Sequence, residues 1–206
     1  GSKNAVLPIL AGSLLNRGIT TLLNVPKISD VMTMIEILKH LGAKVNFFNH
    51  TLVIDGSRVH PENCQIEAFK KLRGSILFLG PMLSLFNKVT LFKPGGDIIG
   101  ARPLDVHLNA LRYLGCSLKE EGEIIEGEFN QLAERRVILK EISVTATENL
   151  LLFLSAIPQK VSLRLVAIEP HVVHLCLFLK KLGVRIKNIG THFLEIEGKR
   201  KIKENI

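Results

Sequence analysis

The sequence predicts an α/β fold made of three repeated helix-strand-helix-strand-strand units. Three observations support this prediction. A helical pattern ending in Leu-Gly occurs three times, two short apolar strands follow each copy, and the marker glycines lie about 70 positions apart, at Gly42, Gly115 and Gly183. We therefore expect one domain over residues 3–198, with units at 3–56, 72–127 and 143–198.

Each unit is expected to begin with an apolar helix and a short strand. The helices are predicted over residues 3–15, 72–86 and 145–157, and the strands over 20–24, 89–92 and 161–166. A second helix follows in each unit. In the first unit, Ser29 or Asp30 is expected to cap this helix and Gly42 to end it. Its apolar residues recur at helical spacing and predict one buried stripe: Val31, Met34, Ile35, Leu38 and Leu41.

The second helices of the other two units differ in their apolar pattern. Leu104, Leu108, Leu111 and Leu114 repeat the single stripe in the second unit. In the third unit, apolar residues surround the helix that starts at Pro170, so we expect it to be more deeply buried. Three such units fit a pseudo-threefold arrangement, with the helices packed inside and the sheets outside.

Composition narrows the classes of partner. Hydrophobic residues make up 47% and charged residues 22% of the 206 residues, which is typical of a folded globular protein. The net charge of +8 favours an anionic partner. The absence of Trp and the single Tyr argue against stacking on nucleic-acid bases. We find no apolar run of membrane-spanning length and no secretory signal, so we expect neither a nucleic acid nor a membrane as partner.

The three cysteines, Cys64, Cys116 and Cys176, are irregularly spaced. An odd number at wide spacing is typical of reduced thiols, and it indicates a cytoplasmic protein rather than a disulfide framework.

A glycine-rich stretch over residues 94–105 is the strongest local candidate for a binding site. Its three glycines allow the backbone to approach a ligand closely, and it carries one carboxylate, Asp97, and one guanidinium, Arg102. Pro103 then opens a helix. A loop of this kind at a helix N-terminus suits an anionic ligand, although a plain turn between a strand and a helix remains open at this point.

Five segments occur in the order and spacing of a known family. They are Lys3-Asn4-Ala5, residues 73–76, residues 95–103, residues 146–149 and Glu169-Pro170. Together they resemble the UDP-N-acetylglucosamine 1-carboxyvinyltransferases, a family of enolpyruvyl transferases, over essentially the whole chain. The resemblance implies one of the two domains of an inside-out α/β barrel, the one that carries the mobile loop. Residues 199–206 are then a basic tail or the start of the crossover to the second domain.

The resemblance also implies an activity. Members of this family transfer the enolpyruvyl group of phosphoenolpyruvate to the 3′-hydroxyl of UDP-N-acetylglucosamine, by addition followed by elimination of phosphate, in the first committed step of peptidoglycan precursor synthesis. No cofactor and no metal is implied. The general base and several arginines belong to the second domain, so we expect this chain alone to be inactive.

The resemblance also assigns roles to residues of this sequence that stand at the family's site positions. The resemblance implies that Asp97, Lys3 and Arg102 are catalytic: Asp97 as the acid on the closing loop, and the two cations near the phosphate of phosphoenolpyruvate. It implies substrate binding at twelve positions, namely Lys3, Asn4, Arg73, Arg102, Pro103, Leu104, Asp105, Val106, Ser143, Val144, Thr145 and Glu169.

Three positions depart from the family pattern. Thr145 replaces a usual glycine, and Ile168 and His171 replace the Arg and Glu of an Arg-Glu-Pro-Glu segment, whereas Glu169 is retained. These departures weaken the expectation of uridine diphosphate contacts on that side of the site.

Three other interpretations were weighed. His171, His174 and Cys176 suggest zinc, but a closed zinc site needs four ligands and no fourth lies nearby in sequence. The sister enolpyruvyl transferase that acts on shikimate 3-phosphate shares the repeated architecture, but the residue 95–103 loop argues against it. The third interpretation is a non-catalytic basic binding module. The net charge supports it, but the sequence contains no nucleic-acid-binding motif.

Asp97 leads to a prediction about fosfomycin, the drug that alkylates the cysteine that many relatives carry here. A carboxylate is a far weaker soft nucleophile than a thiolate, so we expect an intact enzyme with Asp97 to be insensitive to it. Asp97→Cys should create time-dependent inactivation, with a covalent adduct visible by mass spectrometry. Absence of the adduct in the variant would contradict the assignment of Asp97 to this position.

Overall fold

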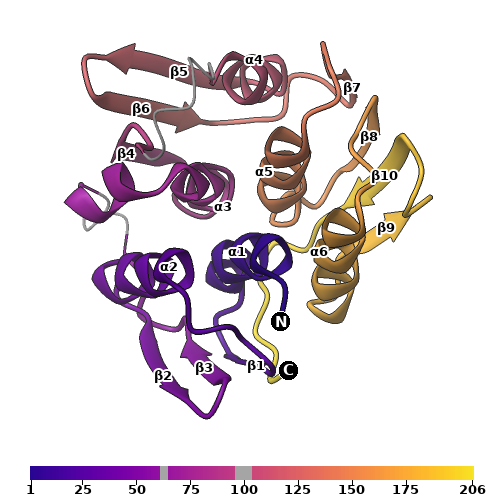
Figure 1. Cartoon of the computed structure of the whole chain (residues 1–206). Coiled ribbons are helices and arrows are strands. Elements are labelled where there is room, and N and C mark those ends of the chain that lie inside the picture. Colours follow the sequence, from indigo (N-terminus) through magenta and orange to yellow (C-terminus); the bar gives the residue numbers. More distant parts are fainter. Residues whose placement is uncertain (61–64, 96–103) are drawn as a thin grey trace.

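Three small sheets surround a group of helices (Figure 1). A computed structural model of the chain describes residues 1–60, 65–95 and 104–206. Helices α1 (Lys3–Gly12), α3 (Leu79–Phe86) and α5 (Val144–Leu154) lie at the centre, and α2 (Ser29–His40), α4 (Asp105–Tyr113) and α6 (Pro170–Lys181) lie around them. The prediction of an α/β fold with helices inside and sheets outside is confirmed.

Each sheet comes from one unit. The first contains β1 (Ile19–Leu22), β3 (Thr51–Asp55) and β2 (Lys44–Phe48), in that order and antiparallel. The second repeats this arrangement with β4 (Lys88–Phe92), β6 (Ile124–Phe129) and β5 (Cys116–Glu121). The third contains β8 (Lys160–Arg164), β10 (Phe193–Glu197) and β9 (Arg185–Lys187), with an additional strand at its edge.

The outer helices end identically. Gly42, Gly115 and Gly183 have φ values of +97°, +106° and +87°, a left-handed conformation that glycine adopts without strain. In each case the glycine N–H donates to the carbonyl three residues earlier, at 3.0 Å. The three Leu-Gly markers are therefore helix ends, as the sequence predicted.

Other details differ from the sequence-based prediction. The N-cap of α2 is Ile28, without a side-chain hydrogen bond, so neither Ser29 nor Asp30 caps this helix. The predicted 72–86 helix is divided into a 3₁₀ helix, Arg73–Phe78, and α3. Helix α6 is not more deeply buried than α2, because each buries five of its twelve residues and Leu177 is half-exposed. The deeply buried helix is α5, in which every residue from Ala146 to Leu154 is buried.

A strand that the sequence did not predict, β7 (Arg136–Ile138), pairs in parallel with β8. The C-terminal segment does the same for the first sheet: Ile202 and Asn205 form parallel bridges with Asn16 and Ile19. Ile202 is buried, and backbone hydrogen bonds attach Ile202 and Ile206 to the first unit. The segment after the third unit thus pairs with the first sheet, and β7, which lies between the second and third units in the chain, pairs with the third.

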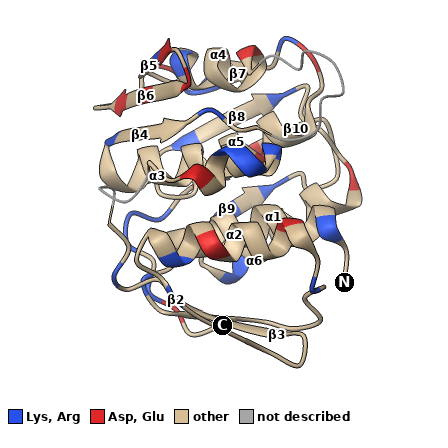
Figure 2. Cartoon of the chain, turned by 60° about the vertical axis from the view of Figure 1, so that its left-hand side comes forward, with Lys and Arg blue, Asp and Glu red and all other residues tan. Residues whose placement is uncertain are grey.

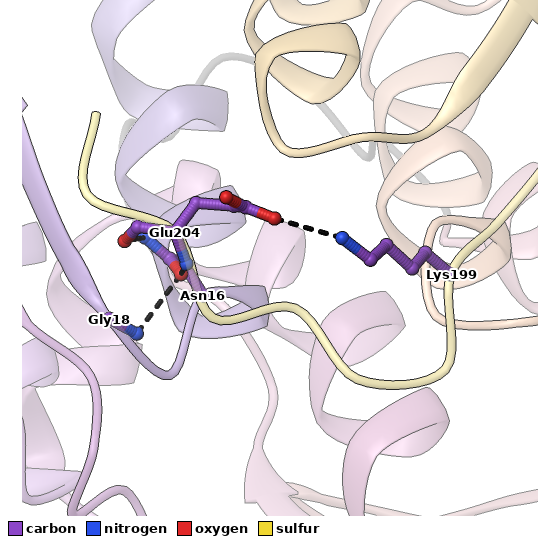
Figure 3. Close-up of polar contacts among 4 residues, drawn as sticks. All are labelled: Asn16, Gly18, Lys199 and Glu204. Atoms are coloured by element: carbon purple, nitrogen blue, oxygen red, sulfur yellow. Dashed lines mark hydrogen bonds and ion pairs between the residues drawn. The ribbon is translucent and has the colours of Figure 1, made fainter.

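Asn16 holds this C-terminal segment (Figure 3). Its fully buried amide donates from Nδ2 to the Glu204 carbonyl (2.9 Å), and its Oδ1 accepts from the N–H groups of Glu204 (2.9 Å) and Gly18 (3.0 Å). A Cβ at Gly18 would overlap the Glu204 carbonyl oxygen. Lys199 adds an ion pair to the Glu204 carboxylate at 2.8 Å. The Asn16 amide thus adds to the backbone hydrogen bonds that join Ile202 to Arg17 and Ile206 to Ile19 and Thr21.

We predict that Asn16→Ala destabilises the chain by roughly 2–4 kcal/mol, because it leaves buried N–H and C=O groups without partners. Urea denaturation measures the change. Asn46→Ala, at an exposed position on β2, is the matched control and should change the free energy of unfolding by less than about 0.5 kcal/mol. Equal effects of the two substitutions would show that Asn16 does not hold the segment.

Candidate functional site

The candidate site is built from the first turns of several helices. Lys3 and Asn4 open α1, Arg73 opens the 3₁₀ helix before α3, and Ser143 is the N-cap of α5. Leu104 is the N-cap of α4. The first N–H groups of a helix lack intrahelical partners and carry the positive end of its dipole, so each of these positions favours a negatively charged group.

Lys3 and Asn4 are both exposed. The ammonium of Lys3 forms an ion pair with the carboxylate of Asp30, 2.5 Å away in the first turn of α2. The structure therefore gives Asp30 a contact that sequence analysis missed: its carboxylate pairs with the lysine instead of capping its own helix. The sequence contains one indication of this contact, because Asp30 lies in the first turn of a predicted helix.

The start of α5 is tied to the chain around it. Ser143 Oγ accepts a hydrogen bond from the Ala146 N–H at 3.4 Å. Thr147 Oγ1 donates to the Ser143 carbonyl (2.7 Å) and accepts from the Ala167 N–H (3.0 Å). Val144 and Thr145, which follow the cap, are both half-buried. The predicted positions 143–145 thus form one rigid turn.

His107 connects α4 to α5 and is the clearest addition to the predicted residues. Its side chain is 4% exposed, with Nε2 3.1 Å from Thr145 Oγ1 and Nδ1 3.4 Å from Asn149 Nδ2. Burial, with a smaller effect of the positive charge of Arg73, lowers the pKa of His107 to about 4. The imidazole is therefore neutral at pH 7, and the half-buried Arg73 lies close enough for its charge to act on the ring.

The start of α4 presents three further predicted residues. Leu104 is half-buried and Asp105 is exposed. Val106 contributes to a pocket of about 320 Å³, whose other walls include Tyr113, Ile138 and Lys140. This pocket joins the predicted nucleotide end of the site to β7.

A buried carboxyl group, that of Glu148, and a half-buried one, that of Glu169, lie near the starts of α5 and α6. Glu148 is 2% exposed, and its Oε1 has no hydrogen-bond partner among the described residues. The predicted residue Glu169, the N-cap of α6, likewise has an unpartnered Oε2 within that part of the chain. Burial, with a smaller contribution from the charge of Glu169, raises the pKa of Glu148 to about 8.

The structure brings some of the predicted residues together. Thr145 forms a hydrogen bond with His107 of α4, and Arg73 lies near enough to shift the pKa of that histidine. Lys3 instead pairs with α2. Asp97, Arg102 and Pro103 lie outside the described residues.

Residues 1–60, 65–95 and 104–206 contain no group of three or more His, Cys, Asp or Glu side chains that could hold a metal ion. His174 is exposed whereas Cys176 is buried, so they do not share a site. Over the same ranges, no helix combines the length and the apolar character needed to cross a membrane.

Glu148 gives a prediction about the pH dependence of stability. Between its ordinary pKa of 4.5 and about 8, the unfolded state loses this proton while the folded state keeps it, so stability falls as pH rises. His107, with its pKa lowered from 6.5, has the opposite effect and only below pH 6.5. We therefore expect the free energy of unfolding of the wild-type chain to fall by up to ~2 kcal/mol from pH 6.5 to 8. Glu148→Gln should remove this decline.

Chemical denaturation at closely spaced pH values measures that decline. Glu126→Gln, at an exposed position on β6, is the matched control and should retain it. A decline that persists in Glu148→Gln would show that this carboxyl group ionises freely in the folded chain.

Comparison with known proteins gives consistent results. The family model for EPSP synthase (3-phosphoshikimate 1-carboxyvinyltransferase) matches residues 1–206. A UDP-N-acetylglucosamine 1-carboxyvinyltransferase from Wolbachia sp. subsp. Brugia malayi is 42% identical over 98% of this chain and 49% of the relative. One from Campylobacter jejuni is 38% identical over 96% of the chain and 47% of the relative.

Solved structures agree on the fold. The enolpyruvyl transferase NikO from Streptomyces tendae has a TM-score of 0.85 at 17% identity, covering 100% of this chain and 49% of its own. EPSP synthase from Acinetobacter baumannii has a TM-score of 0.78 at 18% identity, covering 100% and 47%. The chain spans about half the length of the curated relatives it matches. Because the family model matches all 206 residues, the chain belongs to the EPSP synthase (3-phosphoshikimate 1-carboxyvinyltransferase) family.

Proposed function

We propose that this chain is one domain of an enzyme that transfers the enolpyruvyl group of phosphoenolpyruvate to the 3′-hydroxyl of UDP-N-acetylglucosamine. The observation that carries the proposal is the match of nearly the whole chain, at 36–42% identity, to relatives with the name UDP-N-acetylglucosamine 1-carboxyvinyltransferase. This reaction is the first committed step of peptidoglycan precursor synthesis, so the enzyme acts in the cytoplasm and serves cell wall biogenesis, cell shape and cell division.

The geometry of the site supports the chemistry. Phosphoenolpyruvate and the nucleotide diphosphate are both anionic, and helix N-termini together with Lys3 and Arg73 provide the positive charge that such ligands need. Addition and elimination move negative charge onto the departing phosphate, which fixed cations stabilise better than water does. In this proposal Lys3 and Arg102 bind the phosphate of phosphoenolpyruvate, and Asp97 is the acid on the closing loop.

Substrate contacts divide between the two ends of the site. We assign Asn4 and Arg73 to the reacting end, near the sugar and phosphoenolpyruvate. Leu104, Asp105 and Val106 with Pro103 are assigned to the nucleotide, together with the first turn of α5. Glu169 serves as a polar anchor beside that turn. The second domain, which the relatives' greater length implies, supplies the rest of the site.

One alternative has its own support, because the matching family model describes the enzyme that acts on 3-phosphoshikimate. A basic binding module has less support: in Figure 2, Lys and Arg are interspersed with Asp and Glu, and many of the lysines are in ion pairs.

Phosphate release by the complete enzyme separates the alternatives. We predict turnover with phosphoenolpyruvate and UDP-N-acetylglucosamine, none with shikimate 3-phosphate, and none by the 206-residue chain alone. Lys3→Ala should lower kcat/KM for phosphoenolpyruvate on the order of 10- to 100-fold, because it removes a charge-assisted contact. Lys187→Ala, at an exposed position on β9, should leave it unchanged. Turnover with shikimate 3-phosphate instead would overturn the proposal.

A further inference from the structure

The free edge of the first sheet adjoins a groove. Between α2 and β2 lies a concavity of about 620 Å³, whose apolar walls are Met32 and Ile35 from α2 and Val45, Phe47 and Phe48 from β2. Met32 and Phe48 are 40% and 51% exposed. Large apolar side chains that gather in one exposed concavity, rather than being scattered singly over a surface, indicate a place where another molecule binds.

The backbone of β2 is unpaired along its outer edge. In the described sheet β2 is the last strand and pairs only with β3. Residues 49–50 join the two strands, and both have positive φ, +43° and +58°, which is typical of a two-residue hairpin turn. Such a turn makes Phe48 and Thr51 a hydrogen-bonded pair, and bonded and non-bonded pairs then alternate along the ladder. The N–H and C=O groups of Val45 and Phe47 therefore point away from β3, toward the free edge, where an extended chain can pair with them.

The corresponding edge of the second sheet is occupied by a side chain. Arg112, three residues before the glycine that ends α4, donates from Nε (3.3 Å) and Nη2 (3.0 Å) to the Leu118 carbonyl on β5. In the first unit, Lys39 and Val45 stand at the same distances in sequence from the glycine that ends α2. Lys39 is exposed, and within the described residues it forms no hydrogen bond to Val45. The carbonyl that the second unit closes off with an arginine is therefore open in the first.

The charge around the groove is positive. Lys27 and Lys39 line it, and no Asp or Glu is among the described residues that do so. Lysines at several other positions are in ion pairs, whereas within the described ranges Lys27 and Lys39 form none. Charge complementarity therefore favours a ligand that carries carboxylates.

The two lysines lie toward opposite ends of β2. Lys39 is in the last turn of α2, a few residues before β2 begins. Lys27 follows a segment that is tied to the hairpin turn, because the Val25 N–H donates to the His50 carbonyl at 2.8 Å. A five-residue strand spans roughly 16 Å, so a ligand that reaches both ammonium groups must be elongated.

We infer that the free edge of β2 binds an extended, acidic segment of a partner protein as an additional strand. Main-chain groups of the segment pair with Val45 and Phe47, its apolar side chains enter the groove, and its carboxylates lie at Lys27 and Lys39. A second copy of this chain fits less well, because pairing of two β2 edges would bring the lysines of both copies together. The inference does not depend on the proposed function or on its substrates.

Binding of a peptide probe tests the surface. The probe is a fluorescein-labelled peptide in which Val-Thr-Val lies between pairs of glutamates, and fluorescence anisotropy measures its Kd for the 206-residue chain. The double variant Lys27→Glu/Lys39→Glu should raise Kd by about 10-fold or more, because two attractions become repulsions. The matched control is Lys180→Glu/Lys181→Glu, at two exposed lysines in the last turn of α6, and it should change Kd by less than about 2-fold.

A modified peptide separates strand addition from simple charge attraction. N-methylation of the central amides of the probe removes its backbone donors and leaves its charge unchanged. Strand addition predicts a rise in Kd of about 10-fold or more, because main-chain hydrogen bonds provide much of the affinity in this mode of binding. Equal affinities of the methylated and parent peptides, or of the wild type and the groove variant, would overturn the inference.

Hydrogen exchange locates the contact. In NMR spectra of the chain, the probe should slow exchange of the Val45 and Phe47 amides by about 10-fold or more. Exchange of the Asn46 amide, which faces β3, should stay unchanged. Slower exchange at other amides, with none at Val45 and Phe47, would show that the probe binds a different surface and would refute the assignment.

The nature of the occupant is tested with the same probe. The full-length protein should bind it as tightly as the chain does, whereas binding by the chain alone would show that the second domain covers β2 and would exclude a separate partner. Sedimentation of the chain should show a monomer. A dimer that the probe dissociates would identify a second copy as the occupant and would also overturn the inference.

Discussion

The side-chain amide of Asn149 joins three helical segments at the centre of the molecule. From α5 it bonds to the Ile76 carbonyl in the 3₁₀ helix, to the Gly80 N–H in α3 and to His107 in α4. A buried amide left without these partners would carry a large desolvation penalty, so α3, α4 and α5 can pack only where all of them are met. Gly80 belongs to this arrangement, because a Cβ there would overlap the Asn149 carbonyl.

The repeated units bring these helices into register. In each unit a left-handed glycine ends the outer helix at the same point and returns the chain to the sheet. Parallel pairing then adds β7 to the third sheet and joins the C-terminal segment to β1 of the first sheet. Within the described residues, Arg73 and Thr145 both lie near His107, whereas Lys3 pairs with Asp30.

Near the starts of α5 and α6, buried titratable groups are held in their neutral forms. Among the described residues, Glu148 Oε1 and Glu169 Oε2 have no hydrogen-bond partner, and burial keeps Glu148 protonated well above the usual range. His107 is held neutral by the same physical effect. Functional sites commonly contain such shifted groups, because burial that strengthens electrostatic contacts with a ligand also penalises isolated charges. The remainder of the core is almost entirely aliphatic and aromatic.

The sequence by itself determined the three-unit architecture, the helix ends at Gly42, Gly115 and Gly183, and the main helices and strands. All of these depend on the spacing of apolar residues and glycines along the chain, which can be read from one sequence. Only the tertiary structure decided that Asp30 pairs with Lys3, that His107 meets Thr145 and Asn149, and that Glu204 returns to Asn16. These contacts join residues far apart in the chain, and their energy comes from burial and hydrogen-bond satisfaction, which appear only when the units have packed together.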